Sequence, residues 1–235
     1  MNSTFESGTS AAGTGSYNRL SARAIVTRIA ALTLAVALGA GLTGCGILKP
    51  AESTARYFVL KPLPSNGPGP VAFNSVAVGL GQVKLPAYLF NTSLAISKGT
   101  NEIEYLPSAF WAERLDTGFQ RVLAADLAAI LPAEQVRLSS WQSEDVTAEV
   151  QVTVEQFDVD AKGQGVLVAQ WRILSPGGEK ILKAGGSRLS RQGPPPGTSP
   201  SGAVATLSEL VADLSRQLAQ SLREAPSGQA APVAK

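Results

Sequence analysis

Histidine is absent from this 235-residue chain, and cysteine occurs only once, at Cys45. Without histidine, the chain lacks the usual general base for a serine or cysteine nucleophile and the commonest ligand of catalytic zinc. A single thiol also excludes an intramolecular disulfide. We therefore expect a protein that is not an enzyme, with no catalytic residues, no metal site and no cofactor.

Glycine-rich loops with the spacing that binds phosphate groups are missing as well. Acidic residues do occur in close pairs, Glu102 with Glu104 and Glu144 with Asp145. Paired carboxylates could support glycosidase-type chemistry. These pairs fall on short polar segments, however, where solvent-facing charges are the simpler interpretation.

An excess of charge of one sign is also lacking. The chain has 20 basic and 18 acidic residues, of which residues 1–44 hold three arginines and one glutamate. Subtracting these leaves 17 basic and 17 acidic side chains in residues 45–235, so that part is formally neutral. A neutral domain has no electrostatic basis for binding nucleic acid, and we expect no such partner.

What the sequence does contain is a segment typical of an exported lipoprotein. Three arginines precede an apolar run at residues 29–42, the arrangement of a bacterial signal peptide. The run ends in Leu42, Thr43, Gly44 and Cys45, which resemble a lipobox. That resemblance implies cleavage before Cys45 and a diacylglycerol on its thiol. An uncleaved anchor is the alternative, because residues 29–48 are uncharged and a bilayer needs ~20 such residues.

The lipobox sets the predicted domain organisation. Residues 1–44 are expected to be the signal peptide, residues 45–54 a lipid-anchored leash, residues 55–223 a single folded domain, and residues 224–235 a disordered tail. The domain is long enough to bury a substantial core.

Hydrophobic periodicity within this domain predicts both helices and strands. Residues 112–131 and 204–222 repeat apolar residues at steps of three and four, which indicates amphipathic helices. Strands are expected at residues 56–60, 75–80, 94–97, 102–106, 146–159, 166–174 and 180–190. The two short central strands form a hairpin and the last three a meander. These elements indicate an α/β fold class.

Two positions in these elements carry structural predictions. Val154 and Phe157 fall on opposite faces of a regular strand although both are apolar. We therefore predict a β-bulge near Glu155 and Gln156 that buries both side chains. Asp126 lies near the apolar stripe of the first helix. We expect it at the edge of that stripe, and a buried acid is the alternative.

Four short segments follow the lipobox in an order typical of a known family. They are Arg56-Tyr57-Phe58-Val59-Leu60, then Val76-Ala77-Val78-Gly79 with Leu85-Pro86-Ala87-Tyr88-Leu89, then Phe110-Trp111-Ala112-Glu113-Arg114-Leu115, and the pattern Val-x-Val-x-x-Phe in residues 150–157. In these segments, and over most of residues 45–222, the chain resembles the ABC-type transport auxiliary lipoproteins, the PqiC-like family. The resemblance implies a mixed β-sheet with packed helices.

The resemblance also implies a function and partners. It implies a non-catalytic accessory lipoprotein on the periplasmic face of the envelope, serving an ABC ATPase, a permease and mammalian-cell-entry (MCE) domain proteins that move lipids. Gly46 after the lipidated cysteine implies sorting to the outer membrane. Two other functions stay open, a domain that itself binds and carries lipid, and an assembly or tethering lipoprotein of another envelope machine.

A candidate partner surface is formed by Pro86, Tyr88, Phe90 and Trp111. These residues lie at segment ends, where loops carry much of protein recognition, and Tyr and Trp are favoured anchors at interfaces. The surface could bind the transporter partner or a second copy of the chain in a ring. The alternative is that Tyr88 and Trp111 close the end of the core against the following helix.

Overall fold

The computed structural model of the protein describes residues 54–64, 76–131, 134–138 and 141–225. They belong to one compact unit that begins at Thr54. The lipobox residues Leu42, Thr43, Gly44 and Cys45 lie outside the described residues, as does most of the predicted tail.

The described strands form one mixed sheet of eight strands. Their bounds are β1 Arg56–Phe58, β2 Val76–Leu80, β3 Ser93–Lys98, β4 Glu102–Trp111, β5 Glu134–Leu138, β6 Ala148–Asp160, β7 Gln164–Leu174 and β8 Ile181–Gln192. The order runs β1-β4-β3-β6-β2-β5, and β7 joins β6 to β8. The hairpin and the meander are antiparallel, whereas the β1–β4, β2–β5, β2–β6 and β3–β6 pairs are parallel.

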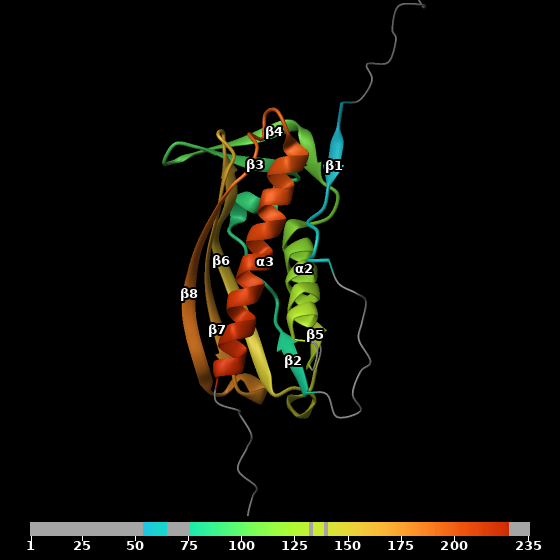
Figure 1. The fold of residues 1–235 in the computed structure, drawn as a ribbon, viewed down its shortest axis with the longest axis vertical. Coiled ribbons are helices and arrows are strands. Elements are labelled where there is room, and N and C mark those ends of the chain that lie inside the picture. The colour runs from blue at the N-terminus through green and yellow to red at the C-terminus, as the bar shows by residue number, and fades with distance from the viewer. Residues whose placement is uncertain (1–53, 65–75, 132–133, 139–140, 226–235) are drawn as a thin grey trace, which may run out of the picture. The chain divides into compact units, whose positions relative to one another are not determined.

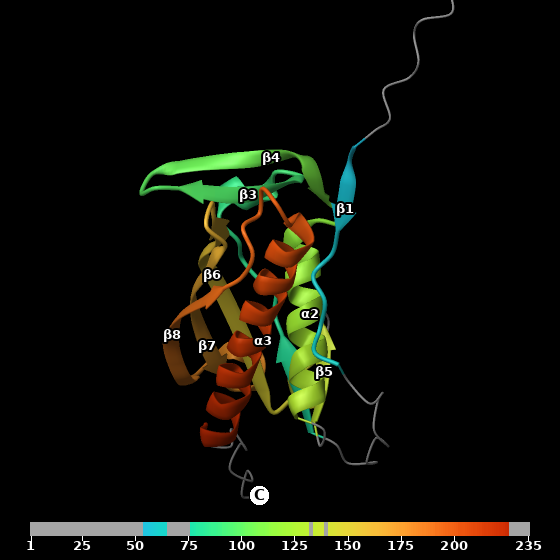
Figure 2. The same cartoon turned by 45° about the horizontal axis from the view of Figure 1, so that its top comes forward.

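Strand β6 is the centre of this arrangement. Its first residues pair with β2, its last residues pair with β3, and its other edge pairs with β7 along the strand. The sheet curls as a result, with the β3–β4 hairpin folding over one end of the molecule (Figure 2).

Two helices pack side by side on the inner face of the curled sheet, α2 Leu115–Ile130 and α3 Pro200–Glu224 (Figure 1). Pro200 opens α3, and the Ser199 side chain accepts a hydrogen bond from the Gly202 amide. Both features are favoured at a helix N-terminus, because Pro needs no amide partner there and Ser satisfies an amide that has none within the helix. The helices and the sheet enclose a single core cluster of apolar side chains.

The predicted β-bulge is confirmed. The β6–β7 register shifts between Val154 and Gln156, and the side chains of Val154 and Phe157 are only 3% and 1% exposed. One extra residue in β6 turns Phe157 back to the inner face. There its ring meets that of Phe119 of α2 edge to face, with the centroids 5.1 Å apart.

The prediction for Asp126 is wrong, because its side chain is completely buried. The helical pattern placed it beside the apolar stripe, but the second helix and an extended segment after β1 cover that side of α2. Its carboxylate accepts hydrogen bonds from the Leu63 amide at 2.7 Å and from the Ser215 hydroxyl at 3.3 Å. These bonds compensate for the loss of water.

Several elements also differ from the sequence prediction. Strand β5 was not predicted, β4 runs on to Trp111, and α2 starts only at Leu115. Residues 110–111 remain in the sheet because they pair with β1. Pro107 is tolerated within β4 because the β3–β4 register is irregular between Ser93 and Ala95.

Candidate functional site

An extended segment, residues 59–64, leaves β1 and runs between the two helices; we call it the strap. Its backbone is held by side chains from both helices. The Lys61 amide donates to Ser208 Oγ at 3.1 Å, the Leu63 amide donates to Asp126 Oδ1, and the Arg121 guanidinium donates to the Leu60 carbonyl at 3.1 Å. Leu60 is buried between these contacts. The strap is therefore a fixed part of the domain.

Asp126 is the titratable group at the centre of this contact. Burial raises the pKa of its carboxyl group above the ordinary value, and the hydrogen bonds from Leu63 and Ser215 only partly oppose that change. The acid fastens the strap to α2 and α3 simultaneously.

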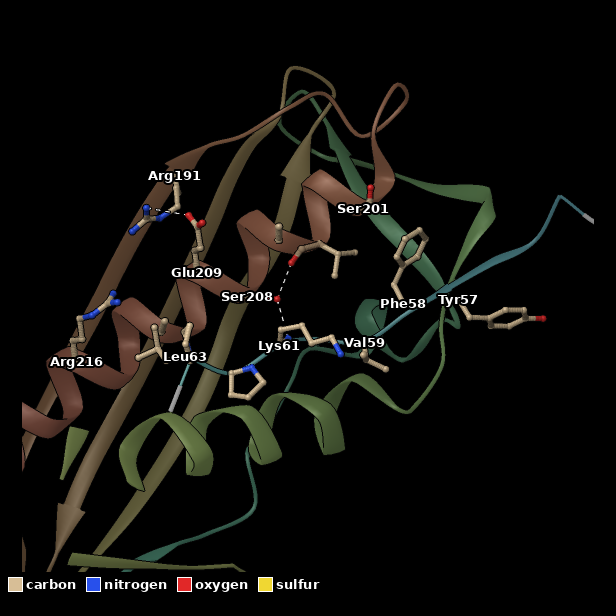
Figure 3. Close-up of a pocket in the computed structure, with 15 residues that line it drawn as sticks. Tyr57, Phe58, Val59, Lys61, Leu63, Arg191, Ser201, Ser208, Glu209 and Arg216 are labelled. Carbon is tan, nitrogen blue, oxygen red and sulfur yellow. Dashed lines mark hydrogen bonds and ion pairs between the residues drawn. The ribbon is translucent and has the colours of Figure 1, made fainter. Parts of the chain in front are cut away.

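A groove of about 760 Å³ lies between the strap and α3 (Figure 3). Phe58 of β1 and Leu63 of the strap line one side of the groove. Val204, Ala205 and Ala212 of α3 line the other side. Val204 and Ala212 are buried, whereas Ala205 is exposed. The groove is therefore open to solvent, and apolar side chains line it from both sides, with Ser201 and Ser208 among them.

Charged side chains lie along one rim of the groove. Arg191 of β8 pairs with Glu209 at 3.0 Å and with Asp213 at 2.7 Å, and Arg216 pairs with Asp213 at 2.6 Å. Lys61 on the strap is exposed and forms no ion pair with any residue in the described part of the chain. The lining thus combines an apolar floor with cations at its edge.

The predicted partner surface is divided by the structure. Tyr88 is half-buried on a 3-10 turn, η2 Ala87–Phe90, and its hydroxyl points to the bulge. That hydroxyl donates to Asp158 Oδ2 at 2.9 Å and accepts from the Phe157 amide at 3.3 Å. Burial is the main cause that raises the pKa of the Tyr88 phenol far above its ordinary value. Tyr88 therefore joins η2 to β6.

The other members of that surface lie differently. Pro86 is half-buried at the start of η2, and Trp111 is only 8% exposed. Phe90 is 54% exposed, with the Arg114 guanidinium 5.7 Å from its ring centroid. Phe90 and Trp111 line a common hollow of about 470 Å³, which Tyr88 and Pro86 do not line.

One exposed aromatic residue was missed as a site residue. Tyr57 is 68% exposed, and its ring centroid lies 5.7 Å from that of Phe110. The two rings come together because β1 pairs in parallel with β4. The sequence predicted a strand at residues 56–60 but ended the other strand at residue 106, before Phe110. It also contained no signal for the pairing, because parallel partners far apart along the chain share no turn.

Within residues 54–64, 76–131, 134–138 and 141–225, no group of His, Cys, Asp and Glu side chains is arranged to hold a metal ion. In the same residues, no helix is both long and apolar enough to span a membrane. Every buried side-chain nitrogen and oxygen atom described has a hydrogen-bond partner.

Comparisons with known proteins agree with this fold. Residues 58–219 match the family model described as the ABC-type transport auxiliary lipoprotein component. The crystal structure of an uncharacterized protein is 19% identical over 72% of this chain and 98% of its own, with a TM-score of 0.61. That of protein XCC0632 from Xanthomonas campestris, family DUF330, is 11% identical over 70% of this chain and 93% of its own, with a TM-score of 0.56. At these identities the structures show the fold alone. No curated protein matches the sequence significantly.

Proposed function

Because the chain belongs to the ABC-type transport auxiliary lipoprotein family, we propose that it is the non-catalytic accessory lipoprotein of an MCE-type system that moves lipids across the cell envelope. The observation that carries the proposal is the family match, which extends from the last residue of β1 into the last turns of α3. It covers α2, the whole meander, most of α3 and every residue that lines the groove except Tyr57.

The lipobox supports attachment to a membrane. In this proposal Cys45 carries a diacylglycerol, and Gly46 favours sorting to the outer membrane. Arg56, where β1 begins, is eleven residues after Cys45. Eleven extended residues span at most about 40 Å. The folded domain therefore works close to the membrane that holds it.

The partners in this proposal are the MCE-domain protein and, through it, the permease and the ATPase of the same system. The described surface offers Phe90 and Tyr57 as exposed aromatic contacts. Aromatic side chains are suited to this role because they bury a large area and lose little conformational entropy. Trp111 lines the same hollow as Phe90, and Pro86 and Tyr88 lie at the start of the turn that ends in Phe90. A second copy of the chain is a further candidate partner for these residues.

The experiment is photo-crosslinking in cells. Benzoylphenylalanine replaces Phe90 in the full-length protein, an aromatic-for-aromatic change at an exposed position. A matched control carries the same group at Ala184, which is exposed on β8. Capture of an MCE-domain protein at residue 90, and not at residue 184, is the expected result. Capture of a component of an unrelated envelope machine at residue 90 would reject the proposal.

The groove beside the strap favours a second candidate function, in which the domain itself binds lipid.

A further inference from the structure

The groove has a linear shape. The α3 residues that line it run from Ser201 to Arg216, a distance of about 22 Å at ~1.5 Å per residue. Four of the seven α3 residues that line it have small side chains, Ser201, Ala205, Ser208 and Ala212. A volume of about 760 Å³ spread over that length suits an extended chain better than a compact molecule.

Residues 61–64 of the strap have no free amide to offer a peptide ligand. Pro62 and Pro64 have no amide hydrogen, and the Lys61 and Leu63 amides already donate to Ser208 and Asp126. An extended peptide binds a strand edge through main-chain hydrogen bonds, which residues 61–64 cannot donate. The Ser208 hydroxyl is satisfied as well, because it donates to the Val204 carbonyl at 2.9 Å. This part of the groove therefore fits a ligand that needs no hydrogen bonds along its length.

The charges at the rim suit an anionic end group. Lys61, Arg191 and Arg216 provide three cations, against two acids, Glu209 and Asp213, which are already paired with the arginines. Lys61 is the cation without an acidic partner in the described residues, and its side chain extends along the strap toward Val59 (Figure 3). A negatively charged group beside the groove would pair with its ammonium group.

We propose that the groove between the strap and α3 binds one acyl chain of a phospholipid, with the lipid phosphate beside Lys61. Apolar side chains from two segments enclose the alkyl chain, and Asp126 holds one of those segments in place. The inference rests on the proposed function for the source of the lipid, since a lipid-transport accessory protein works next to a membrane. It gives that accessory protein a direct contact with the transported class of molecule.

The test uses the full-length lipoprotein in its own bacterium, grown with radiolabelled phosphate. Benzoylphenylalanine replaces Ala205, which is exposed at the groove. The matched control replaces Gln217, which is exposed on the same helix and does not line the groove. A diacylglycerol on Cys45 contains no phosphate. Radiolabel that stays with the irradiated protein on a denaturing gel therefore reports a captured phospholipid and not the anchor.

We expect light-dependent label at residue 205 and only background at residue 217. Adding Lys61→Glu to the residue-205 variant should reduce the label about fivefold, the size expected for losing an exposed ion pair. Lys180→Glu, a charge reversal at an exposed lysine in the β7–β8 turn, should leave the label unchanged.

Equal label at residues 205 and 217, or capture of a protein at residue 205, would overturn the proposal. Label at residue 205 that does not respond to Lys61→Glu would overturn the placement of the phosphate. None of these results alters the capture of an MCE-domain protein at residue 90. Failure of the groove proposal is therefore distinguishable from failure of the proposed function.

Discussion

The Tyr88 hydroxyl and the Asp158 carboxylate meet where the bulge disturbs β6. Asp158 is 2% exposed, and the Tyr88 hydroxyl serves both its carboxylate and the Phe157 amide. Tyr88→Phe should lower the free energy of unfolding by about 1–3 kcal/mol, because buried polar groups lose a partner. Tyr57→Phe is the control, an exposed tyrosine that should change stability by less than ~0.5 kcal/mol. Equal effects in urea unfolding would contradict a structural role for Tyr88.

Asp126 gives the protein a specific pH dependence. Its ordinary pKa of 3.8 is raised in the folded state, chiefly by burial. At a pH between 3.8 and the raised folded-state pKa, Asp126 is protonated in the folded protein and ionised in the unfolded chain. The contribution of Asp126 to the free energy of unfolding is therefore fully present below pH 3.8 and is lost as the pH rises through the folded-state pKa.

Asp126→Asn should remove that dependence while keeping an acceptor for the Leu63 amide. The expected result is that the variant gains stability relative to the wild type as the pH rises from about 4 to 7. Urea unfolding of both proteins across this range measures the difference. Parallel stability curves would show that Asp126 does not titrate differently in the folded state.

At the level of elements, the β7–β8 ladder depends on one glycine. A Cβ atom at Gly185 would lie 2.5 Å from the ring of Trp171, whose Nε1 donates to Ser187 Oγ at 3.0 Å. Gly185→Ala should therefore cost about 1–3 kcal/mol of unfolding free energy through overpacking. Gly186→Ala is a matched control in the next position, where the nearest atom is 3.9 Å away. Thermal unfolding should separate the two variants, and identical melting temperatures would refute the packing argument.

The elements that could be predicted from sequence are those with a local signal. Both helices and the meander have regular periodicity, and the bulge follows from Val154 and Phe157 alone. Strand β5 has only two apolar residues, Val136 and Leu138, and Leu138 is 41% exposed. Its pairing with β2 comes from a segment more than fifty residues earlier. Such parallel pairs depend on the whole fold and leave no pattern in either segment.

The candidate site shows the same limit. Phe90 was identified because aromatic residues cluster at segment ends, and it is exposed. The groove was not identified, because its two walls, the strap and α3, are far apart in the sequence; the Lys61–Ser208 hydrogen bond joins residues 147 positions apart. Burial of Asp126 follows from that same long-range contact. Periodicity within α2 could not reveal it.

At the level of the whole molecule, the proposed anchor at Cys45 precedes the described domain in the sequence. The compact unit begins at Thr54, and the core is formed by residues within the described part of that unit. Cys45→Ala should therefore leave a folded domain that is recovered largely in the soluble fraction, while labelling with radioactive palmitate is lost. Circular dichroism and fractionation are the measurements. Palmitate label that persists in the variant, or an intact residue 1–44 segment in the wild type, would contradict lipid attachment at Cys45.

The central claim is that this chain is the accessory lipoprotein of an MCE-type lipid transport system. The most direct test is affinity purification of the full-length protein, tagged after residue 235 and expressed at its native level, followed by quantitative mass spectrometry. The account predicts that an MCE-domain protein, its permease and its ATPase are enriched together, and that Cys45→Ala greatly reduces their recovery. Enrichment of a different envelope machine, with none of these three components, would contradict the account.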